Sequence, residues 1–300
     1  MKDFNKIYQE IQKESAESIK EKSKLIARKV FIPIICILGI GLLLSIFMQD
    51  SIFLHVSIII FVMVLYYKKN DWRKLYDDYD QIYKERVVRK IIKEYSEKLE
   101  YFPNRGIDST VYTNAGFDCY DEFNSADFVT GTTRNGCKLN LAKVNIKRET
   151  TDSSGKKTLT TVFSGAFINA DIENTFFQSI CIRGDSILEI PNEGRVEMDS
   201  GEFEGTFNVY CKNPIIAMQI LTADVMQLLS DYKAKTTFIP EITIQKDKLY
   251  MRVPISNLFE PVALNNPAGE DLIEREYQII NYTLELIEKL VKNINEAQIY

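Results

Sequence analysis

The sequence is poor in the residues and motifs on which most enzyme sites depend. It contains one histidine, His55, among 300 residues. Because Ser/His/Asp and Cys/His nucleophiles each require a histidine, and His55 lies within a long apolar stretch, catalysis of that kind is excluded. The sequence also has no GxxxxGK[ST] phosphate-binding loop and no GxGxxG dinucleotide motif. We therefore expect no enzymatic activity and no cofactor.

Cysteine is also sparse. The five cysteines contain no CxxC pair, and the only histidine is distant from them, so a zinc site is not expected. A cytosolic location, predicted below, would keep the thiols reduced. We interpret the last four cysteines as small core residues of strands or loops. These are Cys119, Cys137, Cys181 and Cys211.

The excess of positive charge that binding to nucleic acid requires is missing. The formal net charge of the chain is −5. Residues 101–300 alone contain 19 cationic and 28 anionic side chains, a net charge of −9. Since phosphate neutralisation needs a basic face, we expect no nucleic-acid partner.

The sequence does contain two long apolar runs near its N-terminus. Residues 30–48 and 52–67 hold no charged side chain. At about 1.5 Å per residue the runs rise roughly 28 and 24 Å, against a hydrocarbon thickness of about 30 Å. Only three residues separate them. We therefore predict a transmembrane hairpin over 30–67, with the lipid bilayer as its partner.

The charges that flank this hairpin predict its orientation. Lysines and arginines precede residue 30 and follow residue 67, whereas the connecting loop holds no cation. The positive-inside rule then places both outer ends in the cytoplasm. The expected location is the cell membrane, as a multi-pass protein with both termini cytoplasmic.

Hydrophobic periodicity predicts the remaining organisation. We expect a cytosolic amphipathic helix over 1–29, a stalk helix over 68–101, a cytosolic α+β domain over 107–262 and a C-terminal helix over 270–297. The predicted fold class is α+β. It comprises an N-terminal two-helix transmembrane hairpin with a helical stalk, then a mainly antiparallel β domain with one packed helix and the C-terminal helix.

Local turn chemistry predicts several features inside the α+β domain. Asn135-Gly136 between two strand-like runs is typical of a β-hairpin, and residues 152–156 predict a second one. Asn213-Pro214 predicts the start of a helix over 214–232. Residues 236–244 and 248–253 are expected to pair with each other across a turn near Lys246-Asp247.

The C-terminal helix carries a regular apolar pattern. Between residues 273 and 294 apolar side chains alternate spacings of four and three, which is typical of a coiled-coil seam. Further apolar residues widen the stripe, as in a helix that lies on its own domain. Both alternatives remain open, and so does the oligomeric state.

Acidic side chains gather in two places, which raises the question of a metal or an acid–base site. The clusters are Asp118, Asp121, Glu122 and Asp127, and then Asp199, Glu202 and Glu204. No motif fixes their spacing, so we interpret both as solvated surface and predict no catalytic, cofactor-binding or metal-binding residue. Phe117, Tyr120 and Phe123 beside the first cluster are expected to be aromatic core, with a docking surface as the alternative.

Several segments resemble the bacterial family known as domain of unknown function 3137. The segments are Asp127-Phe128-Val129-Thr130-Gly131, Thr161-Val162-Phe163-Ser164-Gly165-Ala166-Phe167-Ile168, Phe203-Glu204-Gly205-Thr206-Phe207-Asn208-Val209-Tyr210 with Ile220-Leu221-Thr222, and Leu249-Tyr250 with Leu258-Phe259-Glu260. The similarity covers roughly residues 70–262. It implies two N-terminal membrane helices before a cytosolic domain, and no assigned activity.

Two functions are consistent with these features. The first is a non-enzymatic module that binds a protein partner or self-associates. The alternative is a membrane-tethered domain that binds a small ligand or lipid headgroup in a cleft between the sheet and the helix at 214–232.

Overall fold

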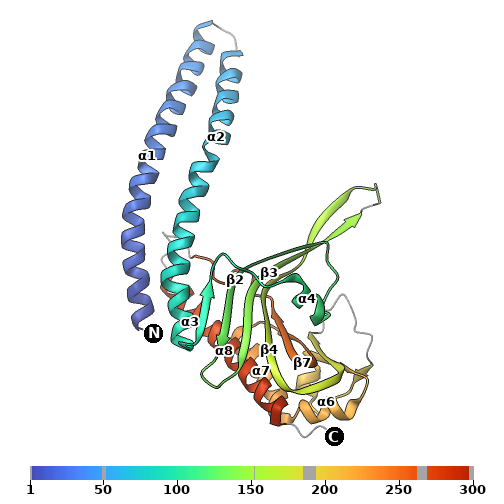
Figure 1. The fold of residues 1–300 in the computed structure, drawn as a ribbon. Helices are drawn as coiled ribbons and strands as arrows, with labels where there is room; N and C mark the ends of the chain where they lie inside the picture. The colour runs from blue at the N-terminus through green and yellow to red at the C-terminus, as the bar shows by residue number, and fades with distance from the viewer. Residues whose placement is uncertain (1, 49–51, 152, 185–193, 262–268, 297–300) are drawn as a thin grey trace. The chain divides into compact units, whose positions relative to one another are not determined.

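The chain divides into two compact units. The computed structural model describes residues 2–48, 52–151, 153–184, 194–261 and 269–296 (Figure 1). The smaller unit contains Met1–Val87 with Pro261–Glu270, and the larger contains Val88–Glu260 with Asp271–Tyr300.

Two long antiparallel helices form the smaller unit. Helix α1 spans Lys2–Met48 and helix α2 spans Ile52–Tyr83, and the two pack side by side (Figure 1). Tyr8 and Tyr79 are both buried. Burial, and then the charge of Tyr8, raise the pKa of the Tyr79 hydroxyl.

The transmembrane hairpin predicted for residues 30–67 is wrong. In the described part of the chain no helix is both long enough and apolar enough to cross a membrane. A hairpin needs two spans, and the run from residue 52 to residue 67 holds 16 residues. Its rise of roughly 24 Å is less than the hydrocarbon thickness of about 30 Å. Where the predicted fold class had a transmembrane hairpin, the structure has a pair of antiparallel helices.

The helical segment that follows α2 ends at Tyr95, whereas the predicted stalk helix ended at residue 101. A π-helical segment, Lys84–Val88, leads into α3, Arg89–Tyr95. Ser96 then adopts an extended conformation, and its N–H donates to the Ile92 carbonyl. Strand β1 follows at Leu99–Phe102 and pairs with β2.

An antiparallel sheet of seven strands is the centre of the larger unit, which confirms the α+β class and the mainly antiparallel pairing. The strand order is β1-β2-β3-β4-β6-β5, and β7 also pairs with β4. The other strands are β2 Glu122–Thr132, β3 Lys138–Thr151, β4 Lys157–Gly184, β5 Arg195–Val196, β6 Phe207–Cys211 and β7 Glu241–Val253.

Both predicted hairpins form. Thr132 pairs with Lys138 across Asn135-Gly136, where Gly136 has a φ of 88°, a value that favours glycine. Strands β3 and β4 form the second hairpin, in which Thr151 pairs with Lys157; residue 152 lies outside the described residues.

Strands β4 and β7 form a ribbon that bends back on itself. Glu241 and Arg252, eleven residues apart, are in contact at 2.8 Å within the single strand β7, whereas eleven extended residues span roughly 36 Å. The bend includes Lys246, at a φ of 52°, and register shifts near Phe176 on β4. The predicted hairpin across Lys246-Asp247 is therefore wrong: residues 241–253 form one bent strand, and both of its legs pair with β4 and not with each other.

The helix predicted over 214–232 is two helices. Asn213 caps α6, Pro214–Ile220, as predicted, because its Oδ1 accepts from the Ile215 N–H at 3.1 Å. Leu221 leaves the helical conformation at a φ of −88° and a ψ of 64°. Helix α7 then begins at Ala223 and ends at Thr236. Val225, Leu229 and Tyr232 are buried along α7.

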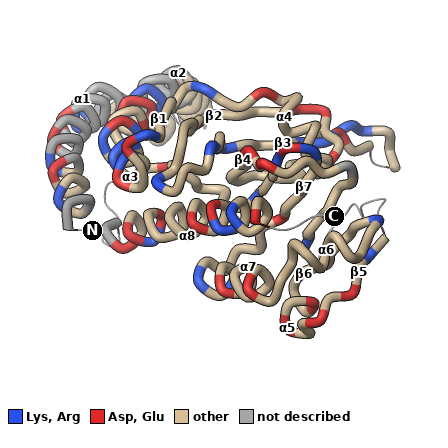
Figure 2. Tube along the Cα trace, turned by 60° about the horizontal axis from the view of Figure 1, so that its bottom comes forward, with Lys and Arg blue, Asp and Glu red and all other residues tan. Residues whose placement is uncertain are grey.

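The C-terminal helix α8, Gly269–Glu296, lies on its own domain. Its heptad residues Ile273, Ile280, Leu284, Ile287 and Ile294 are buried. The hydroxyls of Tyr232 on α7 and Thr283 on α8 are 2.9 Å apart. Figure 2 shows α7 and α8 on one side of the sheet and α4, Ser109–Ala115, on the other. The apolar heptad residues of α8 are thus buried within its own domain. The coiled-coil alternative therefore does not apply to the described residues.

Candidate functional site

The first acidic cluster does not converge on one site. Asp121 and Glu122 lie at or near the surface. Asp127, in contrast, is buried and accepts a hydrogen bond from the Tyr101 hydroxyl at 2.6 Å. Asp118 is buried beside Arg252. The predicted solvated surface is therefore wrong for Asp118 and Asp127.

The second acidic cluster belongs to the turn around α5, Gly201–Glu204. Glu204 Oε1 accepts from the Met198 N–H at 2.9 Å, while Asp199 and Glu202 are exposed. Within the ranges that the structure describes, no three His, Cys, Asp or Glu side chains group as metal ligands.

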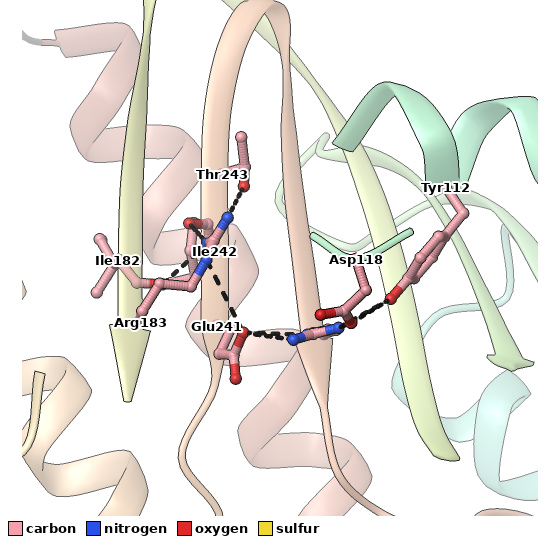
Figure 3. Close-up of polar contacts among 8 residues, drawn as sticks. Tyr112, Asp118, Ile182, Arg183, Glu241, Ile242 and Thr243 are labelled. Carbon is pink, nitrogen blue, oxygen red and sulfur yellow. Dashed lines mark hydrogen bonds and ion pairs between the residues drawn. The ribbon is translucent and has the colours of Figure 1, made fainter. Parts of the chain in front are cut away.

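A buried network of charged side chains joins the two legs of the bent ribbon, at the ends of β7 away from Lys246 (Figure 3). Arg252 donates to Asp118 Oδ2, to the Tyr112 hydroxyl at 2.9 Å, and to Glu241 Oε2 at 2.8 and 3.1 Å. Arg183 lies 3.9 Å from the same Glu241 oxygen. The two arginines are 6% and 2% exposed.

The remaining donors of Arg183 point to the backbone and to one hydroxyl. Its guanidinium donates to the Ile242 carbonyl at 2.6 Å and to Thr243 Oγ1 at 2.8 Å. The centroid of the Phe117 ring lies 4.6 Å from the Arg183 guanidinium carbon and 4.7 Å from that of Arg252. Phe117 is thus aromatic core, as predicted.

The charges of this network balance within it. Two guanidiniums face the carboxylates of Asp118 and Glu241. Burial alone acts to lower the pKa of Arg252, but Glu241, Tyr112 and Asp118 reverse this and raise it. Burial lowers the pKa of Arg183 and raises that of the Tyr112 hydroxyl. Because these donors and acceptors are directed at one another, the network ties the two legs of the bent ribbon together.

Sequence reasoning missed both arginines, although a signal was present. Each interrupts an apolar strand, in Cys181-Ile182-Arg183-Gly184 and in Tyr250-Met251-Arg252-Val253. A lone cation inside such a run is buried only when it is paired. The two arginines therefore indicated an internal ion network without revealing its partners.

A cavity of about 790 Å³ lies beside α8, next to the β2–β3 turn. Glu288 of α8 and Asn135 of the turn contribute to its lining. The Asn135 amide donates to Glu288 Oε2 at 2.7 Å. Burial, then the Glu288 charge and a hydrogen bond to the Glu288 side chain, raise the pKa of the nearby Tyr95 hydroxyl. This cavity is not the predicted cleft against residues 214–232, which do not line it.

The α1–α2 pair carries a broad apolar surface. Consecutive residues are exposed in both helices, so the exposed residues extend beyond a single helical stripe. We define the apolar surface as Ile35, Ile40, Leu42, Leu43, Leu44, Ile46, Phe47, Met48, Ile52, Val56, Ile58, Ile59, Ile60, Val62, Met63 and Tyr66. In the described part of the larger unit, the exposed large apolar side chains are Leu159, Ile215, Met218 and Leu272 alone.

The cysteines differ sharply in exposure, which gives a testable prediction. Cys36 and Cys119 are exposed, so the predicted burial is wrong for Cys119, while the other three are buried. Burial, and then the charges of Glu288 and Asp171, raise the pKa of Cys137 to about 12. At pH 8 its thiol stays protonated and unreactive.

We expect iodoacetamide to modify Cys36 and Cys119 in the native protein and all five cysteines in denaturant. Mass spectrometry measures the modification, and rapid labelling of Cys137 in the native protein would contradict this expectation.

Comparison with known proteins gives a family and one similar structure. No curated protein matches. Among solved structures, the chain is similar to the crystal structure of the mycobacterial trehalose monomycolate transport factor A, TtfA, at 12% identity and a TM-score of 0.35, over 66% of this chain and 92% of that chain. Residues 161–292 match the family model described as "Protein of unknown function (DUF3137)". This match supports the predicted resemblance to the family over residues 161–292.

Proposed function

We propose that the protein is a non-enzymatic assembly module that associates with further copies of itself through the apolar surface of α1 and α2. The observation that carries the proposal is the exposure of that surface, in which Phe47 is 85% and Leu43 is 68% exposed. A contiguous apolar surface of this kind in water marks an interaction site.

A second copy is a suitable partner because it presents the same surface. Two copies related by a two-fold axis would cover each other with identical patches, and association would remove the apolar side chains of both from water.

Cysteine crosslinking of the full chain tests this proposal. Cys36 is exposed within the same stretch of α1 as the apolar surface, whereas Cys119 lies in the larger unit. We expect a short bismaleimide to join two copies in a Cys119→Ser variant. Cys36→Ser, which retains Cys119, is the matched control and should give little product.

Charged substitutions locate the contact. Leu43→Glu with Phe47→Glu should abolish the Cys36 product, because burying two carboxylates against an apolar partner is costly. The matched substitution is Leu159→Glu, also exposed but on β4, and it should leave the yield unchanged. A chain that binds lipid vesicles yet gives no Cys36 product would assign the surface to lipid and contradict self-assembly.

A second candidate function is the binding of a small ligand. The cavity beside α8 favours it, because its volume of about 790 Å³ lies within the range of ligand sites.

A further inference from the structure

The β2–β3 turn contains a chemically labile pair of residues. Asn135-Gly136 is the single Asn-Gly dipeptide of the sequence. The backbone nitrogen of a residue can attack Cγ of a preceding asparagine, and glycine hinders this attack least because it has no Cβ. Both residues are exposed, so water reaches them. The turn is therefore a chemical site for deamidation, in which the side-chain amide becomes a carboxylate.

Two hydrogen bonds hold the pair away from this reaction. The Asn135 amide donates to Glu288 Oε2 at 2.7 Å, which fixes the side chain against α8. The Gly136 N–H donates to the Thr133 carbonyl at 3.1 Å, so the nitrogen that would attack is engaged in the turn. Glu288 is 8% exposed, and the Tyr95 hydroxyl is hydrogen-bonded to its side chain. Because attack on Cγ requires Asn135 to leave Glu288, this contact slows the reaction.

The side chains that line the neighbouring cavity already balance in charge. Asp171 pairs with Lys248 at 2.6 Å. Three further carboxylates match three amines in number, namely Glu173, Glu288 and Glu296 with Lys138, Lys289 and Lys292. A carboxylate at position 135 would be in excess, and it would meet Glu288 where a hydrogen bond now joins the two residues. Two carboxylates at that distance repel each other, so the turn would lose its contact with α8.

We infer that Asn135 is a site of spontaneous deamidation which Glu288 holds in check, and that the charged product detaches the β2–β3 turn from α8. The Gly136 nitrogen loses its proton to water and forms a bond to Cγ of Asn135, while the Cγ–Nδ2 bond breaks and ammonia leaves. One water molecule then opens the succinimide at either carbonyl to give aspartate or isoaspartate. Nothing is oxidised or reduced. This inference does not depend on assembly through α1 and α2, so either proposal can fail alone.

Peptide mapping of the full chain by mass spectrometry, after incubation at mildly alkaline pH, tests the site. We expect aspartate and isoaspartate at position 135, formed more slowly in the native protein than in denaturant. Glu288→Met keeps an apolar stem but has no acceptor, so it should raise the native rate about tenfold, as expected when one hydrogen bond to a charged group is lost. Lys292→Met, exposed on the same helix, is the matched control and should leave the rate unchanged. In denaturant all three chains should react equally.

A double-mutant cycle tests the consequence of the reaction. Asn135→Asp reproduces one product and should lower the denaturation midpoint of the larger unit, followed by near-ultraviolet circular dichroism. Adding Glu288→Gln should recover most of this loss, because a neutral amide can donate to the new carboxylate.

Four results would overturn the inference. Two concern the reaction: no deamidation of Asn135 in denaturant, or equal native rates in the wild type and Glu288→Met. The other two concern the product: an unchanged midpoint in Asn135→Asp, or a loss that Glu288→Gln does not reduce. The rate and the midpoint are measured on different variants, so each half of the inference is tested separately.

Discussion

Replacing Arg252 by methionine should lower the free energy of unfolding of the larger unit by about 3–5 kcal/mol, the range for breaking a buried ion pair from one side. The methionine keeps an apolar stem against Phe117 and Phe163, whose rings lie 4.7 and 4.8 Å from the guanidinium. Asp118 and Glu241, however, lose their donor. The loss comes mainly from the buried carboxylates and not from a cavity, because Asp118 loses its cation and Glu241 keeps only Arg183 at 3.9 Å.

Chemical denaturation followed by near-ultraviolet circular dichroism measures this loss, because it reports the packed tyrosines and phenylalanines. The only tryptophan, Trp72, belongs to the smaller unit and would not report it. Adding Asp118→Asn to Arg252→Met should recover part of the stability, since Arg183 and Glu241, 3.9 Å apart, then balance each other. No recovery would show that packing dominates. Lys157→Met, at an exposed ion pair with Glu149, is the surface control and should leave the denaturation midpoint unchanged.

Replacing Phe167 by alanine should also cost about 3–5 kcal/mol, the usual range for removing a buried phenylalanine. Phe167 is fully buried on β4. Its ring centroid lies 5.0 Å from that of Tyr112 and 6.3 Å from those of Phe117 and Tyr250. The substitution therefore removes apolar burial and several aromatic contacts, and it loosens the support of the Tyr112 hydroxyl that meets Arg252.

A second position on the same strand provides the control for Phe167. Leu159 is 49% exposed, so Leu159→Ala should change stability by less than about 0.5 kcal/mol. The same denaturation measurement serves both variants. Equal losses at the two positions would contradict the assignment of Phe167 to the core.

Local chemistry made some elements predictable. The hairpin at Asn135-Gly136 and the cap at Asn213 depend on residues adjacent in sequence, so their signals are complete in a short window. The apolar period of residues 273–294 predicted a helix. It could not distinguish a seam between chains from a face that covers the chain's own sheet, because both bury the same side.

The bent ribbon and the cavity could not be predicted, because their contacts join distant residues. Arg252 meets Asp118 134 residues away, and Glu288 meets Asn135 153 residues away. No single-sequence pattern relates such positions. The apolar runs at 30–48 and 52–67 predicted helices correctly, but hydrophobic length alone also led to the wrong transmembrane hairpin.

One measurement tests most directly whether the α1–α2 surface joins two copies. It is the yield of the Cys36-to-Cys36 crosslink in the full chain with Cys119→Ser. Self-assembly predicts a covalent dimer whose yield rises with protein concentration and is lost when Leu43 and Phe47 are both changed to glutamate. A chain that remains uncrosslinked across the same concentrations while Cys36 stays reactive toward iodoacetamide would contradict it.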